Sequence, residues 1–273
     1  MVDCRGGTVD LGALEPGLAA VPGTVSIWCA PLGSNHPWYA RAAHASHYAA
    51  SMMKVAVLLA AHRAHQIGRL DLDAPVPVTD RFASALRGAP DYPLARAVDD
   101  DPAVWSRLGA HATLRWLAER MIVRSSNLAG NLVLRHVGIA AADHEWRLVG
   151  ARGSRIGRGI EDAAARAAGI TNEVTAADLG ALLPVAIGAG RWVVDTLAAQ
   201  EHRDDLAAGL PAGTRFPHKS GWVTGVRHGA GVVYPAGGSP YTLVVCTTTA
   251  LPDAAARRLL ARIAAVSFEQ AGT

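Results

Sequence analysis

The sequence lacks any long uninterrupted apolar run, although half of its 273 residues are hydrophobic. A membrane-spanning helix needs about 20 consecutive apolar residues, whereas the apolar segment 55–61 is bounded by Lys54 and His62. Residues 1–5 also show no apolar stretch behind a basic start, which a secretory leader would have. We therefore expect a protein without a membrane partner that is cytoplasmic, or secreted if a leader has been removed.

Charge of one sign is scarce as well. The formal net charge is +3 and no block of lysine or arginine occurs, which argues against a nucleic-acid partner. The balance of 50% hydrophobic and 18% charged residues is typical of a globular protein. The length suits one large domain or two small ones around a shared cleft. We expect a monomer that acts on a small molecule.

Cysteine is rare and scattered. Cys4, Cys29 and Cys246 form no C-x-x-C pair. Cys29 and Cys246 lie in apolar, strand-like runs, which predicts two buried thiols, while a disulfide between neighbouring strands remains open.

Lysine is rarer than arginine by an unusual margin. Lysine and arginine together number 26, and only Lys54 and Lys219 are lysine. A lysine can lose its proton when it is buried near another cation, whereas an arginine cannot. The two lysines are therefore candidate functional groups, unless they are chance survivors of a codon bias.

Apolar periodicity predicts strands at both ends of the chain and helices between them. The expected helices are 10–20, 51–67, a broken helical region 113–190, and 253–268, and the expected strands are 24–30, 38–42, 216–221, 230–234 and 241–249. The simplest arrangement is an α/β fold of the α+β sandwich type. Its antiparallel sheet would come from residues 1–50 and 210–273, flanked by the terminal helices. Residues 51–209 would form an inserted all-helical domain, with the active site in the cleft between the two.

Three short motifs carry nucleophilic and basic groups. Ser51 and Lys54 form S-x-x-K at a predicted helix start, where side chains three apart are neighbours and a neutral amine can take the serine proton. Ser125-Ser126-Asn127 lies between two predicted helices, in a loop that can point into a cleft. Lys219-Ser220-Gly221 lies on a predicted strand, where the glycine permits close backbone approach by a ligand.

Taken together and in this order, the three motifs resemble the S-x-x-K, S-D-N and K-T-G set of class A β-lactamases and penicillin-binding proteins, a β-lactamase/transpeptidase-like superfamily. The resemblance covers nearly the whole chain. It implies that Ser51 is the acylated nucleophile, that Lys54 is its proton acceptor and that Ser125 carries a proton to the leaving nitrogen. It also implies an oxyanion hole made by the backbone N–H groups of Ser51 and Trp222.

The resemblance also implies a set of substrate contacts. Asn127 would bind the acylamide carbonyl, and Lys219 and Ser220 would bind a carboxylate, with Lys219 also keeping Lys54 poised. Arg227 would be a second carboxylate contact, or else a cation on a surface turn. Trp105 would be a gate at the cleft rim, or else a core residue.

Two departures from the family pattern bear on turnover. Ser126 and Ser220 replace aspartate and threonine, which are mild changes. The loop that carries E-x-x-L-N in class A β-lactamases reads Gly159-Ile160-Glu161-Asp162-Ala163. Glu161 is then a candidate deacylating base, or else Glu161 and Asp162 cap the next helix. Efficient β-lactam turnover is therefore in doubt.

We expect a β-lactamase-like serine hydrolase that forms a Ser51 acyl-enzyme with an amide, ester or β-lactam. The alternatives are an acyltransferase or transpeptidase-type amidase and a non-turnover β-lactam-binding protein. No metal or organic cofactor is expected, because the histidines have no carboxylate at ligand spacing.

Overall fold

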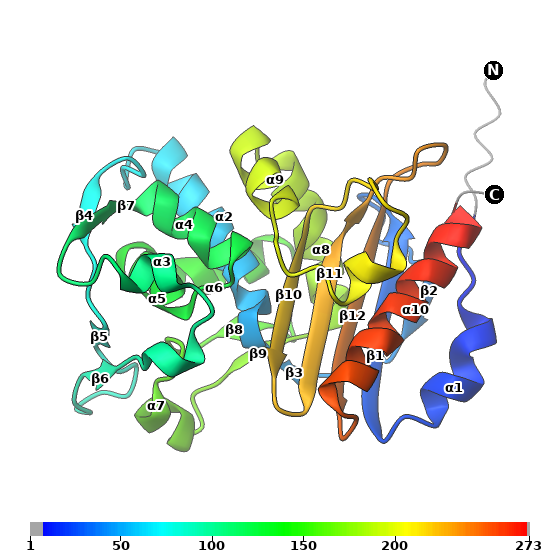
Figure 1. The fold of residues 1–273 in the computed structure, drawn as a ribbon, viewed down its shortest axis with the longest axis horizontal. Helices are drawn as coiled ribbons and strands as arrows, with labels where there is room; N and C mark the ends of the chain where they lie inside the picture. The colour runs from blue at the N-terminus through cyan, green and yellow to red at the C-terminus, as the bar shows by residue number, and fades with distance from the viewer. Residues whose placement is uncertain (1–7, 272–273) are drawn as a thin grey trace.

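A computed structural model describes residues 8–271 of the chain. Its centre is an antiparallel five-stranded sheet in the order β10-β11-β12-β1-β2. The strands are β1 Gly23–Pro31, β2 Tyr39–Arg41, β10 His218–Val223, β11 Val226–Val233 and β12 Tyr241–Thr249. Strand β1 pairs with β12, so the two chain ends build one sheet, as the sequence predicts (Figure 1).

The terminal helices cover the outer face of this sheet. These are α1 Glu15–Ala19, preceded by η1 Gly12–Leu14, and the long α10 Asp253–Ala271, which lie side by side in Figure 1. Their apolar side chains form one core with the outward-facing residues of β1 and β12, including Ile27, Leu243 and Ile263.

The inner face of the sheet packs against the helical half of the molecule. Helix α8 Ala176–Gly188 contacts β1, β11 and β12. Inner-face residues such as Val232 and Val244 belong to the same core as Leu58 and Leu132 of the helical half. Because both faces of β12 are covered, every residue of the strand except Thr248 is buried, and its centre, 243–246, is a continuous apolar run.

The helical half is built around α2, which runs through its centre (Figure 1). Its longer helices are α2 Lys54–Gln66, α4 Leu114–Val123, α5 Asn127–Val137 and α6 Ile139–Leu148. The remaining short elements connect the parts of both halves, and η4 packs against α10. They are η2 Ala50–Met53, η3 Arg96–Val98, η4 Leu206–Gly209, α3 Pro102–Trp105, α7 Ala163–Ala167, α9 Arg191–Ala198, β3 His47–Tyr48, β4 Pro75–Pro77, β5 Arg81–Phe82, β6 Tyr92–Pro93, β7 His111–Thr113, β8 Arg155–Ile156 and β9 Asn172–Val174.

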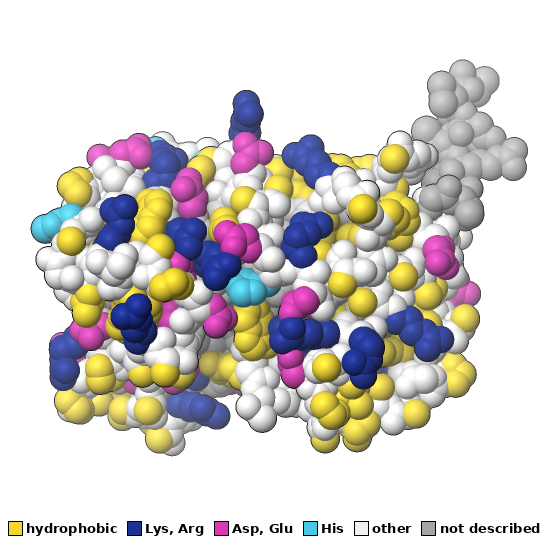
Figure 2. Space-filling view, in the orientation of Figure 1, with side chains coloured by type: hydrophobic (Ala, Val, Ile, Leu, Met, Phe, Trp, Pro, Cys, Tyr) yellow, Lys and Arg dark blue, Asp and Glu magenta, His cyan; other side chains and the backbone are white. Residues whose placement is uncertain are grey.

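The predicted fold class is confirmed, with a sheet made from both chain ends and helices inserted between them. The domain boundaries at 50/51 and 209/210 stay a prediction. No helix within residues 8–271 is long and apolar enough to cross a membrane. On the face drawn in Figure 2, basic and acidic side chains are interspersed over both halves.

The two described cysteines are free and fully buried. Cys29 belongs to the outer core and Cys246 to the inner one, so their side chains project from opposite faces of the sheet. A disulfide between them is therefore excluded. Burial raises the pKa of the Cys29 thiol to about 12 and also raises that of Cys246. Cys4 and the expected absence of a leader concern residues outside the described range.

Candidate active site

Ser51 and Lys54 lie at the junction of the helical half and the sheet. Ser51 is in the 3₁₀ turn η2, and Lys54 is the first residue of α2. The Lys54 Nζ atom lies 2.9 Å from Ser51 Oγ, and the lysine is fully buried. The sequence predicts the helix and the contact. The structure differs only in that the first turn is 3₁₀, as is common at helix ends.

Ser125 and Asn127 enter the same site from the loop between α4 and α5. Ser126 caps α5, because its Oγ accepts from the Ala129 N–H. Lys54 Nζ donates to the Ser125 carbonyl at 2.5 Å and to Asn127 Oδ1 at 2.8 Å. The Ser125 hydroxyl donates to Ser51 Oγ at 2.9 Å. The serine nucleophile candidate thus contacts an amine on one side and a hydroxyl on the other.

Lys219 completes the cluster from the edge strand β10. Its Nζ atom donates to Ser125 Oγ at 3.0 Å and to the Ser220 carbonyl at 2.7 Å. A continuous chain of contacts therefore joins Lys219, Ser125, Ser51 and Lys54. All three sequence motifs, which are 74 and 94 residues apart, meet at one point.

Burial disfavours the charged form of both lysines. It lowers the pKa of Lys54 to about 7, against the opposing effect of the Asp99 and Asp100 carboxylates. Burial also lowers the pKa of Lys219 well below its usual value, and the charge of Lys54 lowers it further. Since the two ammonium groups oppose each other, a proton on one lysine favours a neutral amine on the other.

Strand β10 presents backbone N–H groups to the cleft. The Val232 N–H bonds to the Pro217 carbonyl, which fixes the alternation of the ladder between β10 and β11. Paired residues alternate between bonded and non-bonded positions, so the Trp222 N–H points away from β11, off the open edge. A Cβ built on Gly221 would lie 3.1 Å from the Ser51 nitrogen. The glycine at 221 therefore lets β10 approach the backbone of η2 closely, and the oxyanion hole of Ser51 and Trp222 stays a prediction.

These groups line a cleft of about 310 Å³. Its walls include Ser51, Ser125, Asn127, Glu161 and Trp222, together with Tyr48, Ala50, Val98, Asp100, Ile160, Val223 and Thr224. Of the four non-glycine residues between 8 and 271 with positive φ, three line it, namely Ala50, Ser125 and Glu161. Strained backbone of this kind persists where the surroundings enforce it, and it clusters at functional sites.

The loop after β8 places an apolar side chain beside Lys54. The Asn131 side-chain amide forms two hydrogen bonds with the Ile160 backbone. Its Oδ1 atom accepts from the Ile160 N–H at 2.8 Å, and its Nδ2 atom donates to the Ile160 carbonyl at 2.9 Å. The Ile160 Cδ1 and Lys54 Cε atoms both pack over Gly130, within 3.1 and 3.2 Å of the position of a Cβ. Glu161 follows with an exposed side chain that makes no hydrogen bond or ion pair with any residue of 8–271. Asp162, not Glu161, caps α7.

Sequence reasoning missed the segment 98–99, which holds the loop of Ser126 and Asn127 in place. Asp99 Oδ2 accepts from the Ser126 hydroxyl at 3.0 Å and from the Leu128 N–H at 2.7 Å. The Val98 carbonyl accepts from the Asn127 amide at 2.8 Å. The segment has no periodicity, so its role could be found only from the fold.

Arg227 and Trp105 do not line the cleft, so neither is placed to contact a substrate there. Arg227 is neither in the cleft nor on a surface turn: it is 2% exposed, pairs with Asp253 at 3.2 Å and stacks over the Trp222 ring. Trp105 is a core residue of α3 that does not line the cleft, rather than a gate at its rim.

Ser220 also departs from its predicted position. It follows Lys219 on the strand and so faces the opposite side of the sheet. Its hydroxyl is fully buried, close to the buried carboxylate of Asp205, and does not line the cleft. A direct bond from Ser220 Oγ to a substrate carboxylate would need a rearrangement.

Comparisons with known proteins identify a family and a fold. A model of the β-lactamase enzyme family matches residues 11–270. A curated β-lactamase of Streptomyces fradiae is 31% identical over 179 residues, which is 59% of this chain and 56% of that protein. The chain thus spans little more than half of this relative.

Solved structures of the same fold are similar over nearly their whole length. A β-lactamase of Xanthomonas campestris superposes with a TM-score of 0.81 at 17% identity, covering 95% of this chain and 97% of that one. A mutant of PBP-A, solved as an acyl-enzyme complex with penicillin G, superposes with a TM-score of 0.75 at 20% identity, covering 95% and 96%. At these identities the likeness is one of fold.

Proposed function

The chain belongs to the β-lactamase enzyme family, and we propose that it is a serine hydrolase of this type in which Ser51 is acylated readily and the acyl-enzyme is hydrolysed slowly. The observation that carries the proposal is the position of Ser51 Oγ, 2.9 Å from both Lys54 Nζ and Ser125 Oγ. Its substrate would be a β-lactam or another small amide or ester.

In the acylation step, the neutral amine of Lys54 takes the proton of the Ser51 hydroxyl. The oxygen attacks the carbonyl carbon, and the N–H groups of Ser51 and Trp222 stabilise the charge that develops on the carbonyl oxygen. The carbon–nitrogen bond then breaks, and the leaving nitrogen takes the proton of Ser125 Oγ. Ser125 regains a proton from the two lysines, which share it across contacts of 3.0 and 3.4 Å.

Deacylation requires a base that activates water beside the ester. Ile160 occupies the place next to Lys54, and it cannot accept a proton. A positioned general base contributes about 10²–10⁴ in rate, so its absence favours a persistent acyl-enzyme. The exposed Glu161 is a poor substitute because no neighbour holds its carboxylate.

A slow deacylation also fits acyl transfer to an amine, the second candidate function. An amine nucleophile does not need a carboxylate to activate it as strongly as water does. The acceptor would enter the same cleft.

Intact-mass spectrometry after exposure to penicillin G tests the covalent step. The wild type should gain the full mass of the β-lactam, and peptide mapping should place the adduct on Ser51. Ser51→Ala should gain none, while Thr224→Ala, a neighbour in the cleft wall, should behave like the wild type. An adduct that survives in Ser51→Ala, or that maps to Ser125, contradicts the assignment.

A further inference from the structure

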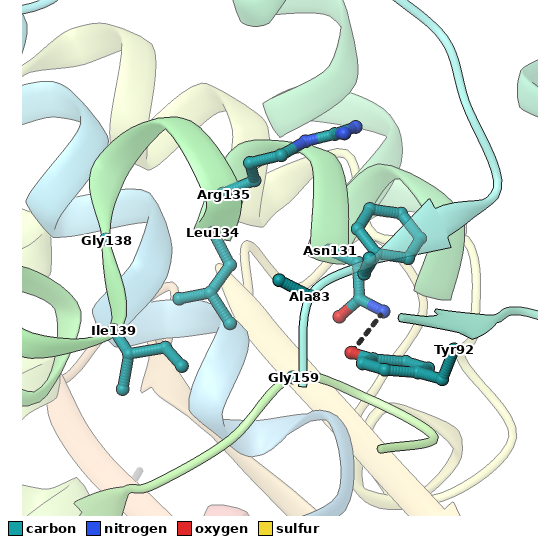
Figure 3. Close-up of a pocket in the computed structure, with 9 residues that line it drawn as sticks. Ala83, Tyr92, Asn131, Leu134, Arg135, Gly138, Ile139 and Gly159 are labelled. Carbon is teal, nitrogen blue, oxygen red and sulfur yellow. Dashed lines mark hydrogen bonds between the residues drawn. The ribbon is translucent and has the colours of Figure 1, made fainter. Parts of the chain in front are cut away.

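A second cavity, of about 280 Å³, lies beside the loop that carries Ile160. Gly159 lines this cavity, whereas Ile160 and Glu161 line the cleft, and the two spaces share no lining residue. The cavity walls come from β5, β6, α5 and the start of α6. Figure 3 shows Leu134 and Ile139 on one side of it and Tyr92 and Asn131 on the other.

The walls are mainly apolar. Leu134, Ile139 and Phe82 contribute aliphatic and aromatic surface, and the Phe82 and Tyr92 rings lie 6.0 Å apart. An apolar cavity of about 150 Å³ is enough to hold benzene. The larger volume here has room for one aromatic ring with a short side chain, but not for a macromolecular segment.

One cation lies at the edge of this apolar space. The Arg135 guanidinium stacks over the Phe82 ring at 5.0 Å and donates one hydrogen bond, to Thr79 Oγ1. Burial lowers the pKa of Arg135. Within the described chain no carboxylate pairs with it, in contrast to Arg120, which is paired with Asp101.

Glu161 and Asp162, the two acidic residues that follow the cavity-lining Gly159, do not neutralise this cation. Asp162 accepts hydrogen bonds from the Ser84 hydroxyl and from the N–H groups of Ala85 and Ala165. Glu161 lines the cleft instead. The Arg135 guanidinium is exposed at the rim of the cavity, and without a counter-ion in the described chain its free donors can pair with an anion from outside.

We propose that this cavity binds a small arylalkyl carboxylate, with its ring among Leu134, Ile139 and Phe82 and its carboxylate on Arg135. The site is independent of the acyl-transfer proposal, since it needs neither Ser51 nor a lysine. It adjoins the cleft through Asn131, whose amide contacts Tyr92 Oη at 3.4 Å and also holds the Ile160 backbone.

Calorimetric titration with 3-phenylpropionate tests the proposal, with 3-phenylpropionamide as the neutral analogue. The acid should bind at one saturable site, about three- to tenfold more tightly than the amide, the range expected of a partly screened charge-assisted pair. Arg135→Gln should reduce the affinity for the acid to that for the amide and leave the amide unaffected. Arg81 is an exposed arginine next to Phe82 on β5, and Arg81→Gln should change the affinity for neither compound.

Two further variants locate the ligand. Ala83→Phe should fill the cavity and remove binding of both compounds, with an unchanged unfolding midpoint confirming that it folds. Lys219→Gln should leave binding intact. Loss of binding in Lys219→Gln with retention in Arg135→Gln would place the acid in the cleft and overturn the proposal. Absence of saturable binding to the wild type would overturn it as well.

Discussion

Two lysines in a protein that otherwise uses arginine are both fully buried within one hydrogen-bonded cluster. Arginine stays protonated when it is buried, whereas an amine can be neutral. Lys54 has a pKa lowered to about 7 by burial, which makes its neutral form available near physiological pH. The residue type, the burial and the contact with Ser51 Oγ together support the proposed role of Lys54 as the base.

Exchange of each lysine for arginine separates the two proposed roles. Lys54→Arg keeps a cation and removes the titratable amine, so acylation of Ser51 should fall about 10²–10⁴-fold. Lys219→Arg should lose less, because Lys219 acts through charge and hydrogen bonding to Ser125. Stopped-flow acylation rates with a chromogenic cephalosporin check both variants. Equal, negligible losses would mean that the lysines are structural.

The residues could be predicted from the sequence where the motif itself carries the chemistry. The lysine count and the S-x-x-K spacing identified Ser51, Lys54 and Lys219, and the resemblance to the S-D-N motif added Ser125. These four residues meet in the structure. The position of Arg227 could not be predicted, because it depends on an ion pair with Asp253 at the start of α10. No local sequence pattern reveals a contact between residues so far apart in the chain.

At the scale of the element, the loop from β8 to α7 carries the proposal of slow deacylation. The Asn131 amide fixes its backbone through two hydrogen bonds, so the residue at 160, rather than the one at 161, is directed to Lys54. The sequence placed a carboxylate near this position, but a shift of one residue changes which side chain faces the cleft.

A substitution that installs a carboxylate at 160 tests this reading of the loop. Ile160→Glu should speed deacylation at least tenfold, whereas Ile160→Gln, which matches its size without the charge, should not. The new anion should also raise the pKa of Lys54, so the acid limb of the acylation profile should move to higher pH. Steady-state and single-turnover rates across pH measure both effects.

Glu161, the natural carboxylate next to Ile160, provides the complementary test of which residue could serve as the deacylating base. Glu161→Gln should leave steady-state turnover nearly unchanged, because the wild-type side chain is exposed and unpartnered within the described chain. A large loss of turnover in Glu161→Gln would make Glu161 the deacylating base and this protein an ordinary β-lactamase.

For the whole molecule, two buried histidines link the sheet to the segment that leads to Ser51. His228 donates to the Tyr48 carbonyl and accepts from the Thr247 N–H, so its neutral form is fully satisfied. His47 lies between the hydroxyls of Ser26 and Thr248. Burial lowers the pKa of each to about 4.

Because the unfolded chain protonates these histidines near pH 6.5, their contribution to stability is present above that pH and is lost as pH falls towards 4. These two groups contribute a slope of up to about 2.7 kcal/mol per pH unit, and His218, whose pKa burial also lowers to about 4, adds up to about 1.4 kcal/mol per pH unit. Asp205, whose pKa burial raises to about 6, opposes up to about 1.4 kcal/mol per pH unit of this slope below pH 6. The free energy of unfolding should therefore still fall on acidification.

Urea unfolding at pH 7, 6 and 5 measures this slope. His228→Gln can keep both hydrogen bonds without titrating, so its slope should be smaller by up to about 1.4 kcal/mol per pH unit. His111→Gln, at an exposed position, should match the wild type. An unchanged slope in His228→Gln contradicts the account.

The main sheet and the longer helices were predictable because their residues carry clear periodicity. The short strands β3, β8 and β9 were missed, since two or three residues hold no period to detect. They form the small sheet that leads into η2 and the Ile160 loop. Tertiary contacts, rather than local preference, create that connection.

The most direct test of the central claim is a pre-steady-state measurement with a chromogenic cephalosporin. Fast acylation and slow deacylation predict a burst of product equal to the enzyme concentration, followed by a much slower linear phase. Ser51→Ala should show neither phase. A linear trace without a burst, at a turnover of tens per second within the usual enzymatic range, would contradict the account.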